Sequence, residues 1–236
     1  MSEKRISPPF ETNTQQLLMQ LRTTPQISKA LTLAAELHHG QLYEDEPYIN
    51  HVLRTALRVQ AKLSDLASDT LLEKNLCEDL VVAALLHDSV EDTVISIEEI
   101  ADCFGLYVAQ IVEDVTYTDE DEATDIDKLA KFRRHEASKL VKWSDSQTNL
   151  EKCEFEQHIG SITPEKYVRR KLRYSHNVAV LEREMPSLAE LIEERTDFLA
   201  LVEQATADGR SSLFPLDRTR RLGRHVVDYP VDAADF

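Results

Sequence analysis

An unbroken run of seven apolar residues, Leu80–Leu86, leads directly into the ionisable residues His87, Asp88, Glu91 and Asp92. As a helix this run has no polar face, so we expect it to be buried on all sides. The four ionisable side chains then lie at the end of a core helix, where unpaired carboxylates are costly and a metal ion is their usual partner. The stretch predicts a metal site, and the alternative is a solvated helix end with ordinary surface charges.

Helical geometry brings these side chains together in pairs. His87 lies over Glu91, and Asp88 lies over Asp92, because residues four apart share one face of a helix. His87 and Asp88 are about 100° apart round the axis. Both can therefore converge on one ion, while Glu91 and Asp92 reach its surroundings.

The composition favours an all-α protein and limits its partners. Among 236 residues there are only five glycines, and no run alternates as a strand does. The 43 acidic residues outnumber the 27 basic ones and leave a net charge of −16. Such a field repels a nucleic-acid backbone and anionic membranes. A small anionic substrate then requires a metal or a local basic cluster.

The cysteines and the N-terminus predict a soluble, cytoplasmic protein. Cys77, Cys103 and Cys153 are odd in number and lack metal-binding spacing, so they are expected to be reduced thiols. The chain starts without the apolar segment of a signal peptide, and no run approaches the roughly 18 apolar residues of a membrane span. The oligomeric state is left open by the sequence.

The remaining patterns predict several more helices around the central one. They cover Thr14–Arg22, Ile27–His39, a segment starting at His51 with Asn50 as its N-cap, a short helix after the capping box Ser96–Glu99, Val108–Val115, Lys128–Asn149 in two pieces, Pro164–Glu184, and a last helix after Pro186. Loops are expected at Gln41–Asn50 and over most of Ser64–Leu76. The domain division is an arm over residues 1–26, a helical domain over 27–206 and a tail over 207–236.

The acidic segment Asp119–Asp127 carries six carboxylates. A calcium loop is one interpretation, but the glycine and the final bidentate glutamate of an EF-hand are missing. A solvated acidic loop is favoured, because like charges in a run keep a segment extended.

A metal needs donors from more than one helix. The best additional donors are His51, at the start of its helix, and Asp145, near the end of another. With His87 and Asp88 they give two imidazoles and two carboxylates, a set that suits Mn²⁺, Fe²⁺ or another first-row ion. The competing histidines are His38, His39 and His135.

Four segments in this order resemble the hydrolase part of the RelA/SpoT-type HD superfamily. They are Pro47–His51 (PYINH), Ala83–Thr93, Phe104–Gly105 and Lys139–Asp145. The chain is most similar to the small stand-alone members, which remove the 3′-pyrophosphate from guanosine tetraphosphate alarmones. The likeness implies an all-α, HD-domain helical bundle and a divalent cofactor, usually Mn²⁺.

The resemblance also implies roles for particular residues. The metal ligands are His51, His87, Asp88 and Asp145. Glu91 and Asp92 position or activate the attacking water, or else only hold the ligands in place. Asn149 matches an asparagine near the nucleotide. Beyond the resemblance, Lys142 and Tyr48 are also expected to bind substrate.

Hydrolysis of a phosphate ester or anhydride suits this set chemically. The ion would act as a Lewis acid and would lower the pKa of its water. Glu91 could accept the proton of the water, while Asp92 holds the geometry or assists the leaving group.

The sequence departs from the family where basic residues normally contact the substrate. After Gln41 it continues with Leu42–Asp45, and after Asp145 with Ser146–Thr148. The remote phosphates of an alarmone would need cations, and Lys142, Lys131, Arg133 and Arg134 could supply them or form a solvated face.

Three hypotheses about function follow. The leading one is a metal-dependent phosphohydrolase acting on a nucleotide, with hydrolysis of the guanosine 3′,5′-bis(diphosphate) 3′-pyrophosphate as the specific reaction. The second is a nucleotidase that acts on a simpler nucleoside phosphate, which the missing basic loop favours. The third is a non-catalytic module that senses a nucleotide, although a scaffold has no need of four converging donors.

Overall fold

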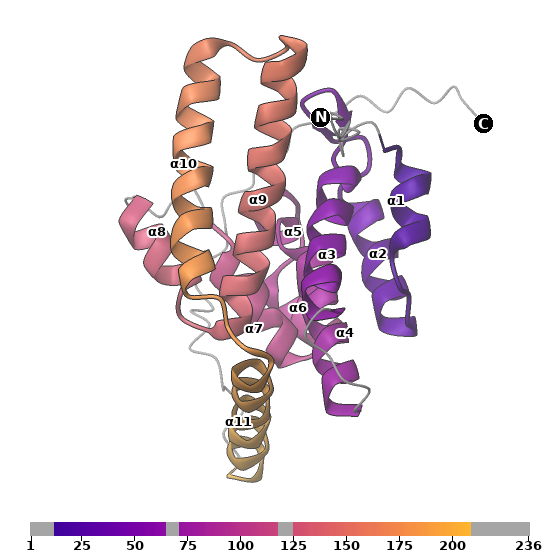
Figure 1. The fold of residues 1–236 in the computed structure, drawn as a ribbon. Coiled ribbons are helices and arrows are strands. Elements are labelled where there is room, and N and C mark those ends of the chain that lie inside the picture. Colours follow the sequence, from indigo (N-terminus) through magenta and orange to yellow (C-terminus); the bar gives the residue numbers. More distant parts are fainter. Residues whose placement is uncertain (1–11, 65–70, 118–124, 209–236) are drawn as a thin grey trace, which may run out of the picture. The chain divides into compact units, whose positions relative to one another are not determined.

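A computed structural model describes residues 12–64, 71–117 and 125–208 of the chain. Within these residues the elements are helices, apart from one short β-hairpin, so the expected all-α class is confirmed (Figure 1). In chain order they are α1 (Thr14–Gln20), α2 (Pro25–Leu37), β1 (Leu42–Tyr43), β2 (Glu46–Pro47), α3 (Ile49–Ser64), α4 (Leu71–Leu86), α5 (Ser89–Asp92), α6 (Ile97–Phe104), α7 (Leu106–Val115), α8 (Asp125–Phe132), α9 (Glu136–Ile159), α10 (Pro164–Arg183) and α11 (Leu188–Ala207).

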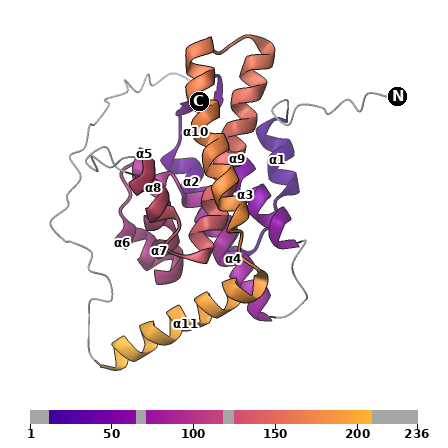
Figure 2. The ribbon, with the colours of Figure 1, turned by 60° about the vertical axis from the view of Figure 1, so that its left-hand side comes forward.

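The apolar run Leu80–Leu86 forms the second half of α4 and is the centre of the core. Each of its side chains is at most 2% exposed. The helix contacts α2, α3, α7 and α9, which surround it on several sides (Figures 1 and 2). Burying one leucine or valine stabilises the fold by about 1.5–3 kcal/mol, so this helix anchors the elements that carry the site.

The prediction that the ionisable residues continue this helix is wrong. α4 ends at Leu86, His87 and Asp88 form a turn, and α5 begins at Ser89. The Nδ1 atom of His87 lies 2.8 Å from the carbonyl oxygen of Ala84. A continuing helix would offer that carbonyl to the amide of Asp88, so the imidazole competes for it where the helix stops.

The predicted loop Gln41–Asn50 contains a two-stranded hairpin. β1 and β2 are antiparallel, with Leu42 opposite Pro47 and Tyr43 opposite Glu46. The strands have only two residues each, too few for an alternating pattern to be visible in the sequence. The turn between them brings the side chains of Tyr43 and Tyr48 to the same region of the molecule.

Asn50 is not the N-cap of its helix, because α3 begins at Ile49. The carbonyl of Tyr48 accepts the amide of His51 at 2.9 Å. The Asn50 side chain instead donates to Glu46 at 3.1 Å and accepts from Thr14 at 2.6 Å. These bonds join α1, the hairpin and α3, and they fix the first turn of α3, in which His51 lies.

α9 is longer than predicted, whereas α10 has nearly the predicted bounds. α9 continues to Ile159 and ends at Gly160, whose φ of 73° lies in the left-handed region that glycine adopts easily. Thr163 caps α10, and Pro164 is its first residue. α9 and α10 run side by side in both views, and α9 also contacts α3 and α4 (Figures 1 and 2). The middle of α9 therefore reaches the end of α4.

The chain divides after Leu199 into two units, and all residues of the site described below belong to the first. The predicted tail and most of the acidic segment Asp119–Asp127 lie outside the described residues, so the division at residues 26 and 206 stays a proposal. No helix among the described residues is long and apolar enough to cross a membrane. The three cysteines are free thiols.

A buried carboxylate on α7 gives a first testable prediction. Asp114 is fully buried and accepts hydrogen bonds from Ser138 (2.8 Å), Gln110 (3.2 Å) and His135. Replacing Asp114 with alanine leaves the buried Ser138 hydroxyl without this partner. We expect the free energy of unfolding, measured in urea, to fall by about 3 kcal/mol.

The Asp114–His135 pair also predicts a pH dependence. The hydrogen bond to Asp114 raises the pKa of His135 above its usual 6.5, although burial acts in the opposite direction. A raised histidine pKa stabilises the fold fully below pH 6.5, and this stabilisation is lost as the pH rises through the folded-state value. The difference in unfolding free energy between wild type and Asp114→Asn should therefore shrink at alkaline pH. If the difference in unfolding free energy stayed constant with pH, the Asp114–His135 pair would not be the cause of the raised pKa of His135.

Candidate metal centre

Two imidazoles from different helices meet in the core. His51 lies in the first turn of α3, and His87 follows the last residue of α4. Both are at most 2% exposed, and their Nε2 atoms are 3.3 Å apart. The Nδ1 of His87 donates to the carbonyl of Ala84. Its Nε2 is therefore the nitrogen that can hold a proton or a metal ion.

Two carboxylates converge on these nitrogens. Oδ2 of Asp88 lies 3.0 Å from Nε2 of His87 and 3.3 Å from Nε2 of His51. Oδ1 of Asp145, from the middle of α9, lies 3.5 Å and 3.3 Å from the same two atoms. The ligand atoms of His51, His87 and Asp145 are all within 4.8 Å of one another. The structure thus brings together the four residues that the sequence predicted as metal ligands.

The electrostatics of this cluster are those of a site that holds positive charge. Burial acts to lower the pKa of His87, but Asp88 and Asp145 outweigh it and raise that pKa well above its usual value. Burial acts to raise the pKa of Asp145, but Lys142 and the two histidines hold it well below its usual value. The carboxylates of Asp88 and Asp145 therefore favour positive charge beside them, which Lys142, protonated imidazoles or a bound cation can supply. The donor set, two nitrogens and two oxygens, fits a divalent first-row ion.

Glu91 and Asp92 lie on α5 beside the cluster, and both residues are exposed at the surface although their carboxyl groups face the cluster. The carboxylate of Glu91 accepts the amide of Tyr117 at 2.9 Å. Loss of water around this carboxyl and the negative charge of Asp88 raise the pKa of Glu91 to about 7, against the opposing effect of Lys142. A carboxyl with a pKa near neutrality can exchange a proton with water at the working pH.

Tyr48 connects the carboxylates of Asp88 and Asp92. Its hydroxyl oxygen lies 2.8 Å from Asp88 and 2.6 Å from Asp92. A phenol has one proton, so it can donate to only one of the two carboxylates at a time. The contact between Tyr48 and Asp92 can also be a hydrogen bond if Asp92 carries the proton. Burial and the negative charge of Asp88 raise the pKa of Asp92, which favours that proton.

Lys142 and Asn149 both bind Asp145 from within α9. The ammonium of Lys142 lies 2.8 Å from Oδ2, and the amide of Asn149 donates to Oδ1 at 2.6 Å. Lys142 keeps only 13% of its side chain exposed, and its pKa is raised by Asp145, Asp88 and Glu91 despite burial. These two residues fix the orientation of the Asp145 carboxylate and border the cluster.

Tyr43, on β1 of the hairpin, is a residue of the site that the sequence patterns did not predict. Its hydroxyl donates to Oδ1 of Asn149, and its ring lies 4.9 Å from that of His51 and 5.8 Å from that of Tyr48. His38 stacks on the other tyrosine, Tyr48, at 4.7 Å. One signal in the sequence could have identified Tyr43. It is an aromatic residue in the loop just before the PYINH segment, at a position where the family has basic residues.

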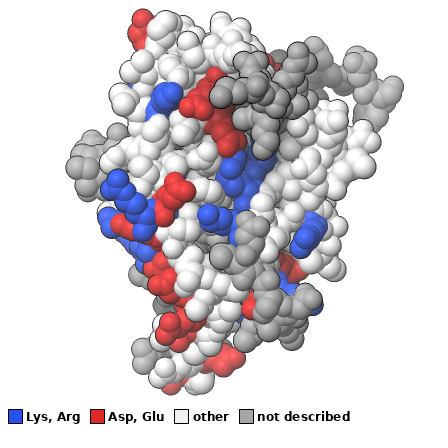
Figure 3. Space-filling model, viewed as in Figure 1, with Lys and Arg blue, Asp and Glu red and all other residues white. Residues whose placement is uncertain are grey.

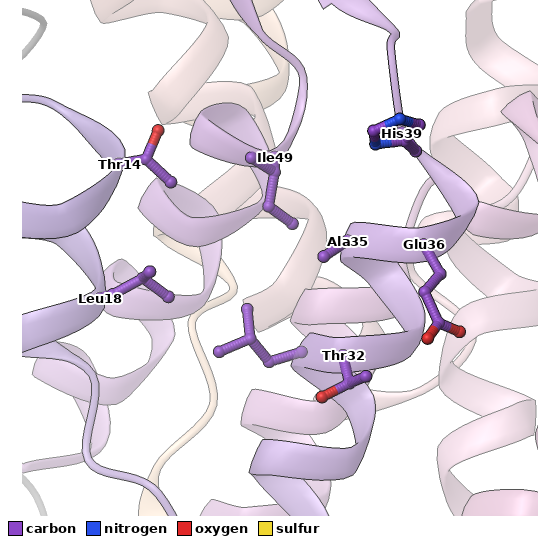
Figure 4. A pocket seen from close by; sticks show the side chains of 8 residues that line it. Thr14, Leu18, Thr32, Ala35, Glu36, His39 and Ile49 are labelled. Atoms are coloured by element: carbon purple, nitrogen blue, oxygen red, sulfur yellow. The ribbon is translucent and has the colours of Figure 1, made fainter. Parts of the chain in front are cut away.

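The three other candidate histidines, His38, His39 and His135, are not among the clustered metal ligands. Nδ1 of His38 bonds to Gln41 at 2.7 Å, and His135 binds Asp114. His39 lies at the edge of a groove of about 680 Å³ between α1, α2 and the start of α3 (Figure 4). None of the four clustered ligands lines this groove, which is mainly apolar; its lining is Thr14, Leu18, Leu31, Thr32, Ala35, Glu36, His39 and Ile49.

Of the basic residues expected to replace the family's cations, Lys142 lies at the site, whereas Arg133 and Lys131 have other partners. Lys142 is there, as described above. Arg133 forms an ion pair with Glu184, and Lys131 donates to the carbonyl of Thr116 at 2.7 Å. The face viewed in Figure 3 carries separate basic and acidic patches rather than one basic band.

Comparisons with known proteins agree with this geometry. The family model described as an HD domain matches residues 30–142. The chain is 31% identical over 165 residues to the guanosine-3′,5′-bis(diphosphate) 3′-pyrophosphohydrolase MESH1 of Danio rerio, covering 66% of this chain and 81% of that protein. It is 30% identical over 161 residues to the Homo sapiens protein of the same name, covering 63% and 77%.

Two further matches extend the comparison. The chain is 41% identical over 92 residues to a guanosine-3′,5′-bis(diphosphate) 3′-pyrophosphohydrolase of Aquifex aeolicus, but covers only 12% of that longer protein. A solved structure, of a metazoan ortholog of SpoT that hydrolyzes ppGpp and plays a role in starvation responses, matches with a TM-score of 0.55 and 25% identity. That match covers 80% of this chain and 99% of the other. The match to the HD-domain model includes His51, His87 and Asp88, and Asp145 lies three residues beyond its end.

Proposed function

Because this chain belongs to the HD-domain family of guanosine-3′,5′-bis(diphosphate) 3′-pyrophosphohydrolases, we propose that it removes the 3′-pyrophosphate from guanosine 3′,5′-bis(diphosphate) with water. The products are GDP and pyrophosphate. The observation that supports this most strongly is the meeting of His51, His87, Asp88 and Asp145 in the core, beside two carboxyls of raised pKa. This is the arrangement that a metal-dependent phosphohydrolase requires.

We propose that His51, His87, Asp88 and Asp145 hold one divalent ion, and that Mn²⁺ is the native one, since imidazole and carboxylate together suit it. When bound, the ion would polarise a phosphoryl oxygen and lower the pKa of water. Metal analysis of protein purified without chelator tests the identity of the ion. A different stoichiometric metal would replace Mn²⁺ in the proposal.

The remaining residues carry the proton transfers and the orientation. We assign Glu91 as the base that accepts the proton of the attacking water, because its pKa of about 7 suits that task. We assign Asp92, whose carboxylate lies 2.6 Å from the hydroxyl of Tyr48, to holding the geometry of the site or assisting the leaving group. Lys142 places positive charge next to the reacting phosphate, and Asn149 and the ring of Tyr48 contact the nucleotide.

A second candidate is a nucleotidase that acts on a simpler nucleoside phosphate. The acidic residues Glu44, Asp45 and Glu46 favour it, because they lie where a highly charged nucleotide would need cations. We place either enzyme in the cytoplasm, where free cysteines stay reduced.

A nucleotide panel separates the candidates. Purified protein with added Mn²⁺ is incubated with guanosine 3′,5′-bis(diphosphate), GTP, GDP and deoxynucleoside phosphates, and products are separated by ion-exchange chromatography. We expect GDP and pyrophosphate from the first compound. Faster turnover of a 5′-nucleotide would instead support the nucleotidase, and tight binding with no turnover of any compound would refute both enzymes and leave a sensing module.

A further inference from the structure

The turn of the hairpin holds a residue in an unfavourable conformation. Glu44 has a φ of 59° and is the one non-glycine residue with positive φ in the described part of the chain. In two-residue hairpin turns such positions favour glycine, since a β-carbon is crowded in the left-handed region. A glutamate here costs free energy, so its side chain is expected to make interactions that offset the cost.

Those interactions are two ion pairs with α10. One carboxylate oxygen of Glu44, Oε1, lies 2.8 Å from Nζ of Lys166 and 2.7 Å from Nη2 of Arg170. The hydrogen bond from Lys166, together with that from Arg170, lowers the pKa of Glu44 despite partial burial. Glu44 thus joins the hairpin to α10, and Arg170 also contacts Glu156 of α9, at 3.4 Å from its Nη1 atom.

The hairpin that carries Glu44 also contacts the metal cluster. Tyr43, next to Glu44 in the chain, contacts His51 with its ring and Asn149 with its hydroxyl. One turn beyond Arg170 on α10, Tyr174 has a pKa raised first by burial and then by the carboxylate of Asp145. Arg170 and Tyr174, which are four residues apart, share one face of α10.

The next two residues of the hairpin engage cations in the same way. Asp45 pairs with Lys152 on α9 at 2.7 Å. Glu46 pairs with Arg54 on α3 at 2.7 Å and with Lys152 at 3.3 Å. Three consecutive carboxylates therefore neutralise cations of three helices, α10, α9 and α3.

We propose that Glu44 is a specificity-determining residue, whose carboxylate occupies the two cations of α10, Lys166 and Arg170, that would otherwise bind a phosphate group remote from the metal cluster. A nucleotide with phosphates on both sides of its sugar has to displace Glu44 in order to bind fully. A nucleotide with phosphates only at the reacting end does not. This inference rests on the proposed function for the identity of the nucleotide, but not for the cation pair itself.

The substitution Glu44→Gln tests the proposal because it keeps the shape of the side chain and removes its charge. We expect KM for guanosine 3′,5′-bis(diphosphate) to fall by about three- to tenfold, the range of a partly exposed charged hydrogen bond. KM for guanosine 3′-diphosphate should stay as in wild type. Glu184→Gln is the matched control, since it removes the same charge from the Arg133 ion pair at the far end of α10.

A binding measurement keeps this test independent of turnover. Calorimetry with inorganic pyrophosphate on metal-free protein should show tighter binding to Glu44→Gln than to wild type, and the gain should vanish in Glu44→Gln/Arg170→Met. If no nucleotide is hydrolysed but the gain is seen, the proposed function fails and this inference stands. If nucleotides are hydrolysed but neither KM nor pyrophosphate affinity changes in Glu44→Gln, the inference is overturned.

The variant Glu44→Gly separates a specificity role from a structural one. Glycine removes the carboxylate and also relieves the left-handed backbone, so the affinity should rise as in Glu44→Gln while Tm stays at or above that of wild type. If both variants lower Tm and raise KM for every nucleotide, Glu44 only holds the hairpin in place, and the proposal is wrong.

Discussion

Replacing Asp88 with asparagine should abolish both metal binding and hydrolysis while leaving the fold intact. Oδ2 of Asp88 is the one carboxylate oxygen that lies within 3.3 Å of both imidazoles and also accepts from Tyr48. An amide of the same size keeps the hydrogen bond to Tyr48 but loses the charge that a cation requires. Since even residues that only orient metal ligands change affinity by about 10–100-fold, kcat/KM should fall by more than about a hundredfold.

Thermal unfolding separates this loss of metal from a loss of folding. At a free Mn²⁺ concentration 100 times the Kd, binding stabilises wild type by about 2.7 kcal/mol, which raises Tm by about 5–10 °C for a domain of this size. Asp88→Asn should show a normal Tm without metal and almost no rise with it. A full rise in Tm, or activity equal to that of wild type, would refute the assignment of Asp88 as a ligand.

Glu91→Gln should have the opposite combination of effects, a large loss of turnover with metal binding retained. A general base contributes about 10²–10⁴-fold to rate, so kcat should fall within that range while the Mn²⁺-induced rise in Tm persists. If the Mn²⁺-induced rise in Tm is also lost in the variant, Glu91 holds the metal ligands in place instead of accepting the proton of the water, and the assignment of Glu91 as base is wrong.

The pH profile gives a second test of Glu91. The base acts when it is deprotonated, so below its pKa the wild-type kcat/KM should fall tenfold per pH unit. The pKa of about 7 belongs to the protein without an ion, and a cation nearby lowers it. The acidic limb is therefore expected at or somewhat below pH 7, and it should be absent from the residual activity of Glu91→Gln.

The same raised pKa predicts a stability effect of known sign. A carboxyl whose pKa is higher in the folded state than in the unfolded state destabilises the fold as the pH rises from about 4.5 to about 7. Glu91→Gln lacks this penalty, so metal-free variant protein should have a higher Tm than wild type at pH 8 and the same Tm near pH 4. Equal values at both pH values would show that Glu91 is fully solvated.

Local signals in the sequence were sufficient for the fold class and for His87 and Asp88, whereas His51 and Asp145 were chosen among competing residues through the family resemblance. The uninterrupted apolar run identified the buried helix, and ionisable residues at its end identified the site. The capping box at Ser96 and the Thr163–Pro164 start were found because each depends on neighbours along the chain.

The parts that were missed depend on distant contacts. Asn50 has the residue type of an N-cap, but its side chain is used by Thr14 and Glu46, so α3 begins one residue before it. The break between α4 and α5 coincides with the contact of the His87 imidazole with the carbonyl of Ala84, which no helix propensity predicts. Tyr43 was missed because its partner Asn149 lies 106 residues away.

The four clustered donors also come from distant parts of the chain, and this has a consequence for folding. His51 and His87 are separated by 36 residues, and Asp145 follows after a further, longer segment. An ion held by all of them would close two large loops at once, and closing loops is entropically costly for an unfolded chain. Uptake of the ion would therefore act as a crosslink between α3, the end of α4 and α9, so that chelators should accelerate unfolding and proteolysis as well as stop catalysis.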